Sequence, residues 1–336
     1  MANRDIIVIG ASAGGLQALV ELCKALPGDL GASIFVVVHV PADNPSMLAA
    51  ILGRSGPLPV EAAEDGAEIQ PGRIYVARAD HHLLLKRGTI ATPHGPKENS
   101  FRPAVDPLFR TAARAYGPRV IGIVLSGALD DGAYGLSVVK DLGGIAIVQD
   151  PGDALVDSMP LAAIRTVEAD YILPIAAMAP VIVRLTQEDI SEEADDLPSQ
   201  NGNQHDVAEG GPDAMETGAL PGAPSGFTCP ECGGAIWELA TKKLLRYRCH
   251  VGHAYNAESL LSEQTTQLEA VLWAALRALE ENAALQRRMA RRAKDAKLDG
   301  VADAYEKNSL ESSDRAAFLR DVLLVRAVPL PQAKGR

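Results

Sequence analysis

The sequence predicts an α/β protein whose first half folds as a doubly wound, mostly parallel β-sheet between two layers of helices, a three-layer αβα arrangement. Short aliphatic runs alternate with amphipathic stretches over residues 1–187. Each run is nearly continuous in apolar residues, as strands buried on both faces are. Apolar residues make up 47% of the 336 residues and aromatic residues only 4%, so the core must be aliphatic.

Six aliphatic runs are the predicted strands of this sheet. They cover residues 6–9, 34–38, 74–77, 120–125, 145–148 and 171–173. Helical patterns lie between several of them, at residues 16–26, 46–54, 104–116, 133–142, 160–167 and 177–185. The stretch 57–95 has shorter runs and turn residues, which predicts an antiparallel hairpin on one edge of the sheet.

A strongly acidic segment follows this first domain of residues 1–187. Residues 188–225 carry ten acidic and no basic side chains, out of a net charge of −11 for the whole chain. The segment is rich in Gly, Pro, Ser and Asn and has no apolar period, so it cannot bury enough surface to offset its ordering entropy. We therefore expect a disordered linker over 188–225.

Polar side chains follow three of the predicted strands. Ser12 lies in a glycine-rich loop after the first strand, His39 ends the second, and Asp130 and Asp131 follow the strand at 120–125. Because ligands and chemistry gather at the carboxyl ends of parallel strands, we expect these groups on one rim of the sheet.

The glycine-rich loop has several possible meanings. A dinucleotide fingerprint would need glycine where Ser12 stands, and no Gly-Lys-Ser/Thr of a P-loop follows. Gly10, Ser12 and Gly14 instead match the Gly-x-Ser-x-Gly nucleophile elbow, with a structural or phosphate-binding turn as the alternative. A serine nucleophile needs a base and an orienting carboxylate. His39 fits the first need and an aspartate the second, unless they are a core histidine and an Asp-Gly turn.

Four runs of sequence together resemble a known family. IGASAGG, HVP, FRPAVDPLF and VLSGALDDGAYG occur in this order and resemble the catalytic domain of chemotaxis protein-glutamate methylesterases of the CheB type, over roughly residues 4–187. The resemblance implies Ser12 as nucleophile, His39 as base and Asp131, rather than Asp130, as the orienting carboxylate. It implies hydrolysis of glutamate γ-methyl esters, and possible deamidation of glutamines, on the cytoplasmic helices of chemoreceptors.

The same resemblance suggests which groups would bind the oxyanion and the substrate. No cofactor is expected for the catalysis itself. Arg102 is expected either to face the substrate or to form an ion pair with Asp106. The oxyanion candidates are the elbow and the loop after the strand at 120–125: Ala13, Gly14, Gly127 and Ala128.

The chain departs from the family pattern at Ala13, where many members have threonine, and at Ala128, where the family has methionine. Two further departures bear on the charge of the site and on its control. Asp130 stands where the family has asparagine, which adds a negative charge beside Asp131. The first strand of the methylesterase domain begins near residue 5, so the phospho-accepting receiver domain of typical members is expected to be missing. The esterase would then be constitutive, or be controlled by its own C-terminal part or by a partner.

Three cysteines and a histidine pair form a second motif. Cys229 and Cys232 are spaced C-x-x-C, and Cys249 follows after sixteen intervening residues, with His250 and His253 close behind it. This spacing predicts a zinc-ribbon-like module over residues 226–256 with a structural zinc ion, although a redox or vestigial pair is the alternative. We expect His253 rather than His250 as the fourth ligand, because the glycine before His253 lets the chain curl back.

The sequence pattern over residues 257–328 predicts a helical hairpin or coiled region. An a/d-like spacing is set by six residues: Leu261, Leu268, Leu272, Ala275, Leu279 and Met289. A second helix at about 303–326 is expected to fold back on the first. This hairpin suggests self-association or docking to a signalling partner. Nucleic-acid binding is disfavoured because acidic residues interleave with the basic ones and base-stacking aromatic residues are missing.

The predicted location and function follow from these parts. No apolar run reaches the roughly 18 residues of a membrane helix and no secretory signal is evident, so we expect a cytoplasmic protein. The predicted function is a serine hydrolase that demethylates chemoreceptor-type proteins. The rival hypotheses are a non-catalytic adaptor and an esterase or deamidase for a different protein.

Overall fold

The computed structural model describes residues 2–41, 47–190, 222–239 and 244–326. Two compact units result from the packing, residues 1–261 and residues 262–336. None of the helices within the described ranges combines the length and the hydropathy that crossing a membrane requires.

A seven-stranded sheet forms the centre of the first unit, and every neighbouring pair in it is parallel. In spatial order the strands are β10 (Tyr171–Leu173), β9 (Ile145–Gln149), β8 (Val120–Val124), β2 (Ile6–Ala11), β3 (Ser33–Val38), β5 (Ile74–Val76) and β4 (Val60–Ala62). The first strand in sequence, β2, therefore lies between β3 and β8, and the chain winds outward from it in both directions. The predicted fold class is confirmed.

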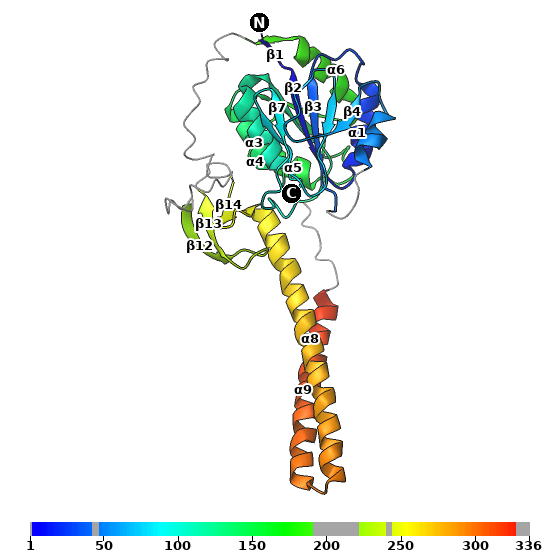
Figure 1. Cartoon of the computed structure of the whole chain (residues 1–336), viewed down its shortest axis with the longest axis vertical. Helices are drawn as coiled ribbons and strands as arrows, with labels where there is room; N and C mark the ends of the chain where they lie inside the picture. The colour runs from blue at the N-terminus through cyan, green and yellow to red at the C-terminus, as the bar shows by residue number, and fades with distance from the viewer. Residues whose placement is uncertain (1, 42–46, 191–221, 240–243, 327–336) are drawn as a thin grey trace. The chain divides into compact units, whose positions relative to one another are not determined.

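Helices cover both faces of this sheet (Figure 1). One face carries α1 (Gly15–Ala25), α2 (Leu48–Gly53) and α6 (Ile175–Gln187), and the other α3 (Val105–Tyr116), α4 (Ala133–Asp141) and α5 (Ser158–Thr166); the short 3-10 turn η1 (Gly117–Arg119) leads into β8. Because side chains alternate along a strand, Ile7 of β2 belongs to the first apolar layer and Val8 to the second.

The edge of the sheet differs from the prediction. The hairpin expected between residues 57 and 95 exists as β6 (Leu84–Lys86) and β7 (Thr89–Ala91), but it forms a separate two-stranded sheet. The edge is β4 instead, whose three residues are partly or fully exposed and so carry little apolar signal. A further pair, β1 (Ala2–Asn3) and β11 (Asp189–Ile190), is antiparallel.

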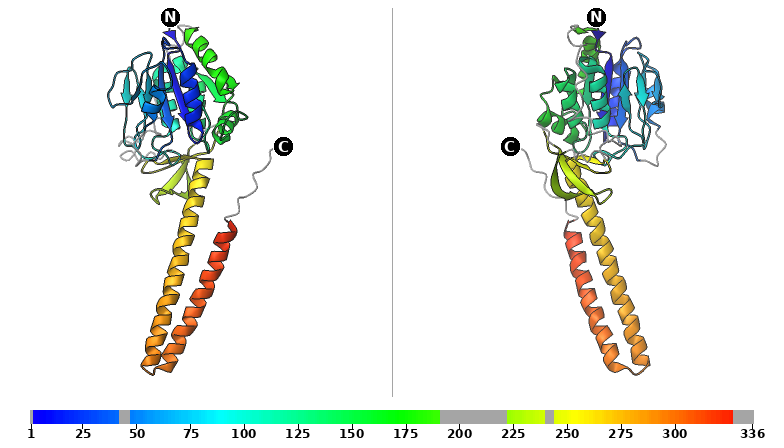
Figure 2. Two further views of the ribbon diagram at one scale, coloured as in Figure 1. Left: turned by 90° about the vertical axis from the view of Figure 1, so that its right-hand side faces the viewer. Right: turned by 60° about the vertical axis from the view of Figure 1, so that its left-hand side comes forward.

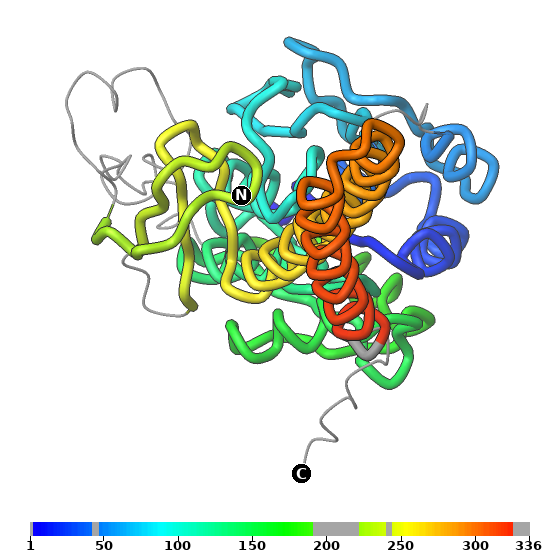
Figure 3. Tube along the Cα trace, turned by 90° about the horizontal axis from the view of Figure 1, so that it is seen from below, coloured from blue at the N-terminus to red at the C-terminus, as the bar shows by residue number. Residues whose placement is uncertain are grey.

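A second sheet of four antiparallel strands belongs to the same unit (Figure 1). Figure 3 traces the path of its chain as a tube seen from below. We call its strands the four-stranded module: β12 (Gly222–Thr228), β13 (Ala235–Leu239), β14 (Arg246–Cys249) and β15 (Ala254–Asn256). The predicted linker 188–225 therefore contains strand residues at both ends, in β11 and β12, and its remainder, 191–221, lies outside the described residues. The predicted boundaries at 187 and 256 also do not coincide with the unit boundary after residue 261.

The helices α8 (Ala257–Asp295) and α9 (Asp299–Arg326) form a hairpin (Figure 2). Leu276, Ala316 and Leu323 make a small apolar cluster between them. Of the residues predicted to form the seam, Leu261 and Leu268 are 66% and 46% exposed. Leu272 and Leu279, also predicted there, do pack against this cluster. The contact continues through small buried residues that the pattern of large apolar side chains does not include: Ala283, Ala290, Ala293, Ala302 and Ser309.

Candidate active site and metal centre

The loop that carries Ser12 is a tight strand-to-helix turn between β2 and α1. The Ser12 N–H donates to the Ser126 carbonyl at 3.0 Å, and the Gly15 N–H donates to the Ser12 carbonyl at 2.9 Å. Gly14 has φ +78°, and a Cβ there would lie 2.8 Å from Ser126 Oγ. Only glycine meets both conditions, so the turn keeps Ser12 half-buried at the carboxyl end of β2.

Parallel topology brings three of the predicted residues together. His39 Nδ1 lies 3.1 Å from Ser12 Oγ, and His39 Nε2 lies 2.8 Å from Asp131 Oδ2. The side chains of His39 and Asp131 are only 3% and 1% exposed. The imidazole also stacks on the Phe101 ring, with centroids 3.6 Å apart and an angle of 7° between the planes.

The two ring nitrogens of His39 have different partners, which determines the tautomer. An ionised Asp131 can only accept, so Nε2 of the neutral ring carries the proton. Nδ1 is then an acceptor, and the Ser12 hydroxyl donates to it. This is the protonation state in which an imidazole can take up a proton from a serine hydroxyl.

Asp131 is held ionised in a dense set of donors. Its oxygens accept from His39 Nε2 (2.8 Å), Val105 N (2.7 Å), Asn99 Nδ2 (2.8 Å), Asp106 N (3.1 Å) and Gly132 N (3.0 Å). Burial opposes ionisation, but the hydrogen bond and charge of His39 and the Val105 and Asn99 donors hold the pKa of Asp131 below its ordinary value. The carboxylate is thus fixed in orientation and in charge.

A second buried carboxylate, Asp106, lies beside Asp131 and was not predicted as part of the site. Its oxygens accept from the N–H groups of Gly132 (3.1 Å) and Gly135 (2.6 Å), and from Asn99 Nδ2 (3.0 Å). Burial and the nearby charge of Asp131 raise the pKa of Asp106. The Asn99 amide therefore bridges two carboxylates that would otherwise repel each other.

Arg102 does not form the ion pair with Asp106 that was one of its two predicted alternatives. Its Nη2 and Nε donate to Asp80 Oδ1 at 2.5 and 2.9 Å, and its Nη1 donates to the Gly95 carbonyl at 2.6 Å. Asp106 is completely buried and already saturated by the donors described above. Arg102, with its side chain 14% exposed, lies outside the buried network.

The oxyanion candidates divide into two groups. The Gly127 N–H donates to the Val156 carbonyl at 3.0 Å and is therefore occupied. A Cβ on Gly127 would lie 2.8 Å from Ser12 Cβ, so this residue must be glycine to let the loop approach the serine. Within the described part of the chain, no acceptor contacts the N–H groups of the other three: Ala13, Gly14 and Ala128.

Asp130 turns away from the His39 side of the site. Its Oδ1 accepts from Ser259 Oγ at 2.5 Å and its Oδ2 from the Glu258 N–H at 3.2 Å, so it caps the first turn of α8. Burial raises the pKa of Asp130 to about 7, with further contributions from Asp106, Glu258 and Asp131 against the Ser259 bond. The extra charge noted in the sequence thus faces the start of a helix.

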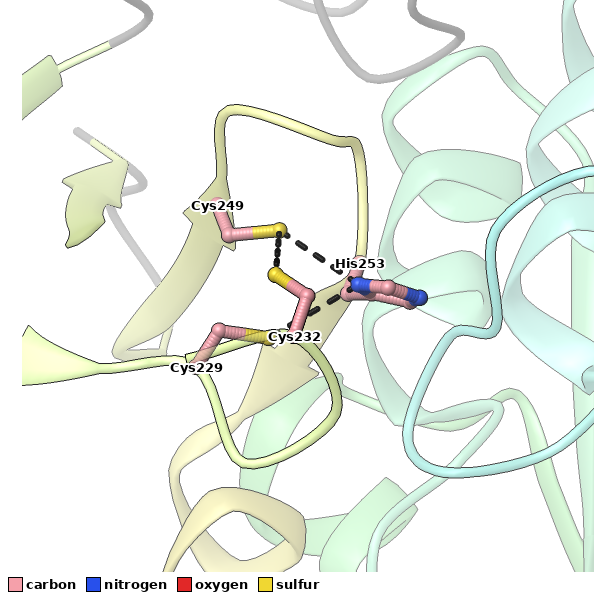
Figure 4. Close-up of side chains that lie close together, drawn as sticks. All are labelled: Cys229, Cys232, Cys249 and His253. Atoms are coloured by element: carbon pink, nitrogen blue, oxygen red, sulfur yellow. Dashed lines mark hydrogen bonds between the residues drawn. The ribbon is translucent and has the colours of Figure 1, made fainter. Parts of the chain in front are cut away.

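A second site is the cluster of Cys229, Cys232, Cys249 and His253, whose ligand atoms lie within 4.8 Å of one another (Figure 4). His253 Nδ1 is 3.7 Å from Cys229 Sγ and 3.5 Å from Cys249 Sγ, and the sulfurs of Cys232 and Cys249 are 3.7 Å apart. A tetrahedral zinc site has bonds of about 2.3 Å to sulfur and about 2.0 Å to nitrogen, which places S–S pairs roughly 3.8 Å and S–N pairs roughly 3.6 Å apart.

The donor set and its spacing therefore fit a tetrahedral metal ion. The structure brings His253, not His250, into the cluster. His250 is exposed, and its ring lies 6.4 Å from that of Trp237. Gly252, with φ +111°, allows the reversal that turns His253 toward the cysteines.

With this geometry established, comparison with known proteins places the chain. The family model of the CheB methylesterase matches residues 7–182. The chain belongs to the CheB methylesterase family. The family match includes Ser12, His39 and Asp131, and ends before the four-stranded module and the helical hairpin.

Relatives and a solved structure of this family agree. A Leptospira interrogans protein provisionally named protein-glutamate methylesterase/protein-glutamine glutaminase is 37% identical over 191 residues, 56% of this chain and 99% of the relative. A Moorella thermoacetica protein-glutamate methylesterase/protein-glutamine glutaminase is 40% identical over 54% of this chain and 44% of its own length. The crystal structure of the Thermotoga maritima CheB methylesterase catalytic domain superposes with a TM-score of 0.53, 35% identity and coverage of 55% of this chain and 100% of that one.

Several residues around the site were not predicted from the sequence. Asn99 and Phe101 contact Asp131 and His39, and Asn256 reaches the same network from β15. Phe101 could have been identified from the sequence, because it is the first residue of the FRPAVD run. Nothing local marks Asn256, whose role depends on a contact with a residue 157 positions earlier in the chain.

Proposed function

We propose that this chain is a serine hydrolase that cleaves glutamate γ-methyl esters and can deamidate glutamine side chains. The observation that carries the proposal is the Ser12–His39–Asp131 arrangement in a member of the CheB methylesterase family. The names of the relatives, protein-glutamate methylesterase/protein-glutamine glutaminase, support both reactions. Ester and amide substrates require the same residues.

The geometry supports a two-step mechanism. Ser12 Oγ attacks the ester carbonyl while His39 Nδ1 takes its proton, and Asp131 stabilises the resulting imidazolium. Methanol leaves with a proton from His39, and water activated by the same ring then cleaves the acyl-enzyme. Free N–H groups near Ser12, those of Ala13 and Ala128 in particular, are the proposed donors to the oxyanion.

The proposed substrates are the methylated cytoplasmic helices of chemoreceptor-type proteins, which places the enzyme in the cytoplasm and in chemotaxis signalling. Support comes from the CheB family assignment. The α8–α9 hairpin is a candidate arm for self-association or for a signalling partner, because Leu268 and Phe318 expose 46% and 72% of their surface.

Methanol release from methylated receptor cytoplasmic fragments tests the proposal directly. Wild type is expected to release methanol, and Ser12→Ala is expected to lose about 10⁶-fold in kcat, as removal of a serine nucleophile does elsewhere. Ser55→Ala is the matched control, because Ser55 is a serine whose hydroxyl bonds only its own helix end. Ammonia release from glutamine-bearing fragments measures the second activity. A folded wild type that binds the fragments and releases neither product would favour an adaptor.

We also propose that Cys229, Cys232, Cys249 and His253 hold a structural zinc ion. Such an ion supplies cross-linking of the module rather than chemistry on the substrate. Elemental analysis of the purified protein should find one zinc per chain. His253→Ala should lose it and destabilise the module, whereas the matched variant His250→Ala should keep it. Equal zinc content in both variants would contradict the assignment.

A further inference from the structure

Strand β15 of the four-stranded module pairs with the segment before α3. The Asn99 N–H donates to the Ala254 carbonyl at 2.8 Å, and the Ala254 N–H donates to the Lys97 carbonyl at 3.3 Å. The Asn256 N–H then donates to the Asn99 side-chain oxygen at 2.7 Å. Residues 97–99 thus lie along the edge of a sheet that belongs to another part of the chain.

The same segment touches the Ser12–His39–Asp131 set. Asn99 Nδ2 donates to Asp131 Oδ1 at 2.8 Å, and Phe101 stacks on the His39 ring. The main chains of Glu98 and Phe101 bond each other in both directions, at 3.1 and 2.9 Å. One short turn therefore holds contacts with both the base and its orienting carboxylate.

The backbone of this turn is strained, so contacts with neighbouring segments must stabilise it. Asn99 and Ser100 have φ of 50° and 71°, a conformation that residues other than glycine rarely adopt and that costs of order 1 kcal/mol or more for each residue. The β15 pairing and the Asn256–Asn99 bond act directly on this turn. Without them the Asn99 side chain would keep only its bonds to Asp131 and Asp106.

Buried ion pairs of Glu98 also hold the turn in place. Glu98 accepts from Arg110 at 2.8 and 2.9 Å, and from Arg246 of β14 at 2.7 Å. Arg246 is 1% exposed and lies 4.1 Å above the Tyr134 ring centroid. The module therefore supplies one of the two cations that neutralise a fully buried carboxylate.

Asn256 completes the connection to the carboxylate network. Its side-chain amide donates to Asp106 Oδ2 at 3.2 Å and to the Asp130 carbonyl at 3.1 Å. Asn256 is fully buried, as are Asn99 and Asp106 at 1% exposure or less. A single residue of the module thus contacts Asn99 with its backbone and the Asp106–Asp130 segment with its side chain.

We propose that Asn256, at the end of β15, is a positioning residue of the catalytic centre. Its backbone N–H holds the Asn99 side-chain oxygen, and its side chain donates to the same Asp106 oxygen as the Asn99 amide. That amide orients the Asp131 carboxylate and, through it, the His39 ring. The module is then part of the catalytic machinery, although it lies outside the matched family segment. The inference rests on the triad assigned in the proposed function, but it does not depend on which ester the enzyme cleaves.

The test uses the full-length protein and a fluorophosphonate probe, which phosphonylates an activated serine and releases fluoride. Asn256→Ala is expected to lower the second-order rate of Ser12 labelling about tenfold, less than the ~100-fold that a 1 Å misplacement can cost. The proton resonance of the His39–Asp131 hydrogen bond should shift or broaden. Arg165→Gln is the matched control, because Arg165 makes an exposed contact with Glu258, two residues beyond Asn256.

A double-mutant cycle with Asn99→Ala separates positioning from general stability. If the Asn256 side chain acts through the Asp106 oxygen that it shares with Asn99, Asn256→Ala should reduce labelling much less in the Asn99→Ala background than in the wild type. Equal effects in both backgrounds, or a wild-type labelling rate with an unshifted resonance in Asn256→Ala, would overturn the proposal.

Hydrogen exchange measures whether Asn256→Ala unfolds the four-stranded module. Lost protection in β13 and β14 with slow labelling and an intact seven-stranded sheet supports the inference, because the triad then depends on the module. Lost protection with wild-type labelling overturns it. Labelling requires no methylated receptor. A wild-type protein whose Ser12 is labelled by the probe but which releases no methanol therefore refutes the proposed substrate and leaves the positioning role standing.

Discussion

The two faces of the central sheet and the junction with the four-stranded module are buried to a similar degree but by opposite means. Both layers over the sheet are aliphatic, with residues such as Ile7, Leu19 and Val124 completely buried. The junction instead buries a carboxylate, its arginine partners and a pair of asparagines, as Glu98, Arg246 and Asn256 illustrate. Apolar packing tolerates small changes of shape, whereas buried polar groups depend on each partner being present.

The difference teaches where specificity of orientation comes from in this protein. An aliphatic core can hold the sheet together, but it has no directional bonds with which to aim a carboxylate. The junction has many of them, and they converge on Asn99 and Asp131. The regions should accordingly respond very differently to substitution.

The largest effect on stability is expected at Glu98. Glu98→Gln removes the carboxylate with which Arg110 and Arg246 both pair, and should lower the free energy of unfolding by about 3–5 kcal/mol, as breaking a buried ion pair does. Urea unfolding measures the change. Glu61→Gln is the control, because the Glu61–Arg73 pair is solvent-exposed and should contribute less than about 1 kcal/mol. Similar losses in both variants would remove the contrast between buried and exposed pairs.

Asp130 should give the junction a distinct pH dependence. Its pKa rises from an ordinary value of 3.8 to about 7 in the folded protein, so folding favours the protonated form. The stability that Asp130 contributes is complete below about pH 4 and is lost as the pH rises to about 7. Relative to Asp130→Asn, the wild type should therefore lose on the order of a few kcal/mol across that range. Parallel pH curves for the two proteins would contradict the raised pKa.

A conservative change in the sheet core should cost less. Ile123→Val removes one methyl group from a fully buried position on β8, and should lower the free energy of unfolding by roughly 0.5–1.5 kcal/mol. Thermal unfolding followed by circular dichroism is sufficient to detect it. A loss as large as that of Glu98→Gln would show that the core is as intolerant as the junction.

The smallest effect is expected at the exposed rim of the same junction. Arg165 and Glu258 pair at 2.8 Å but are 58% and 51% exposed. Arg165→Gln should change the free energy of unfolding by less than about 0.5 kcal/mol, and added salt should abolish even that difference. A loss of several kcal/mol would mean that proximity to the buried network matters more than exposure.

The features that sequence patterns predicted well are those set locally or by topology. The aliphatic runs marked six of the seven parallel strands, and parallel winding was sufficient to place Ser12, His39 and Asp131 on one rim. Strand β4 was missed because its three residues are too exposed to form an apolar run.

The features that could not be predicted depend on contacts between distant parts of the chain. Arg246 and Asn256 meet Glu98 and Asn99 across 148 and 157 residues, and no local spacing encodes such a meeting. The Arg102–Asp106 ion pair, one of the two alternatives given for Arg102, does not form for the same reason. Proximity in sequence suggested it, but in three dimensions Arg102 pairs with Asp80, and the buried Asp106 carboxylate accepts from backbone N–H groups instead.

The polar junction also bears on how this architecture could be inherited or recombined. A module joined through an apolar patch can be moved to a new host that offers any comparable patch. Here the Arg246 guanidinium needs Glu98 and the Asn256 backbone N–H needs the Asn99 side-chain oxygen, so a host without those two acceptors would receive a buried cation and a buried N–H with nothing to bind. We therefore expect the C-terminal module and the turn at 98–99 to be inherited together, although they are encoded by two separate stretches of the gene.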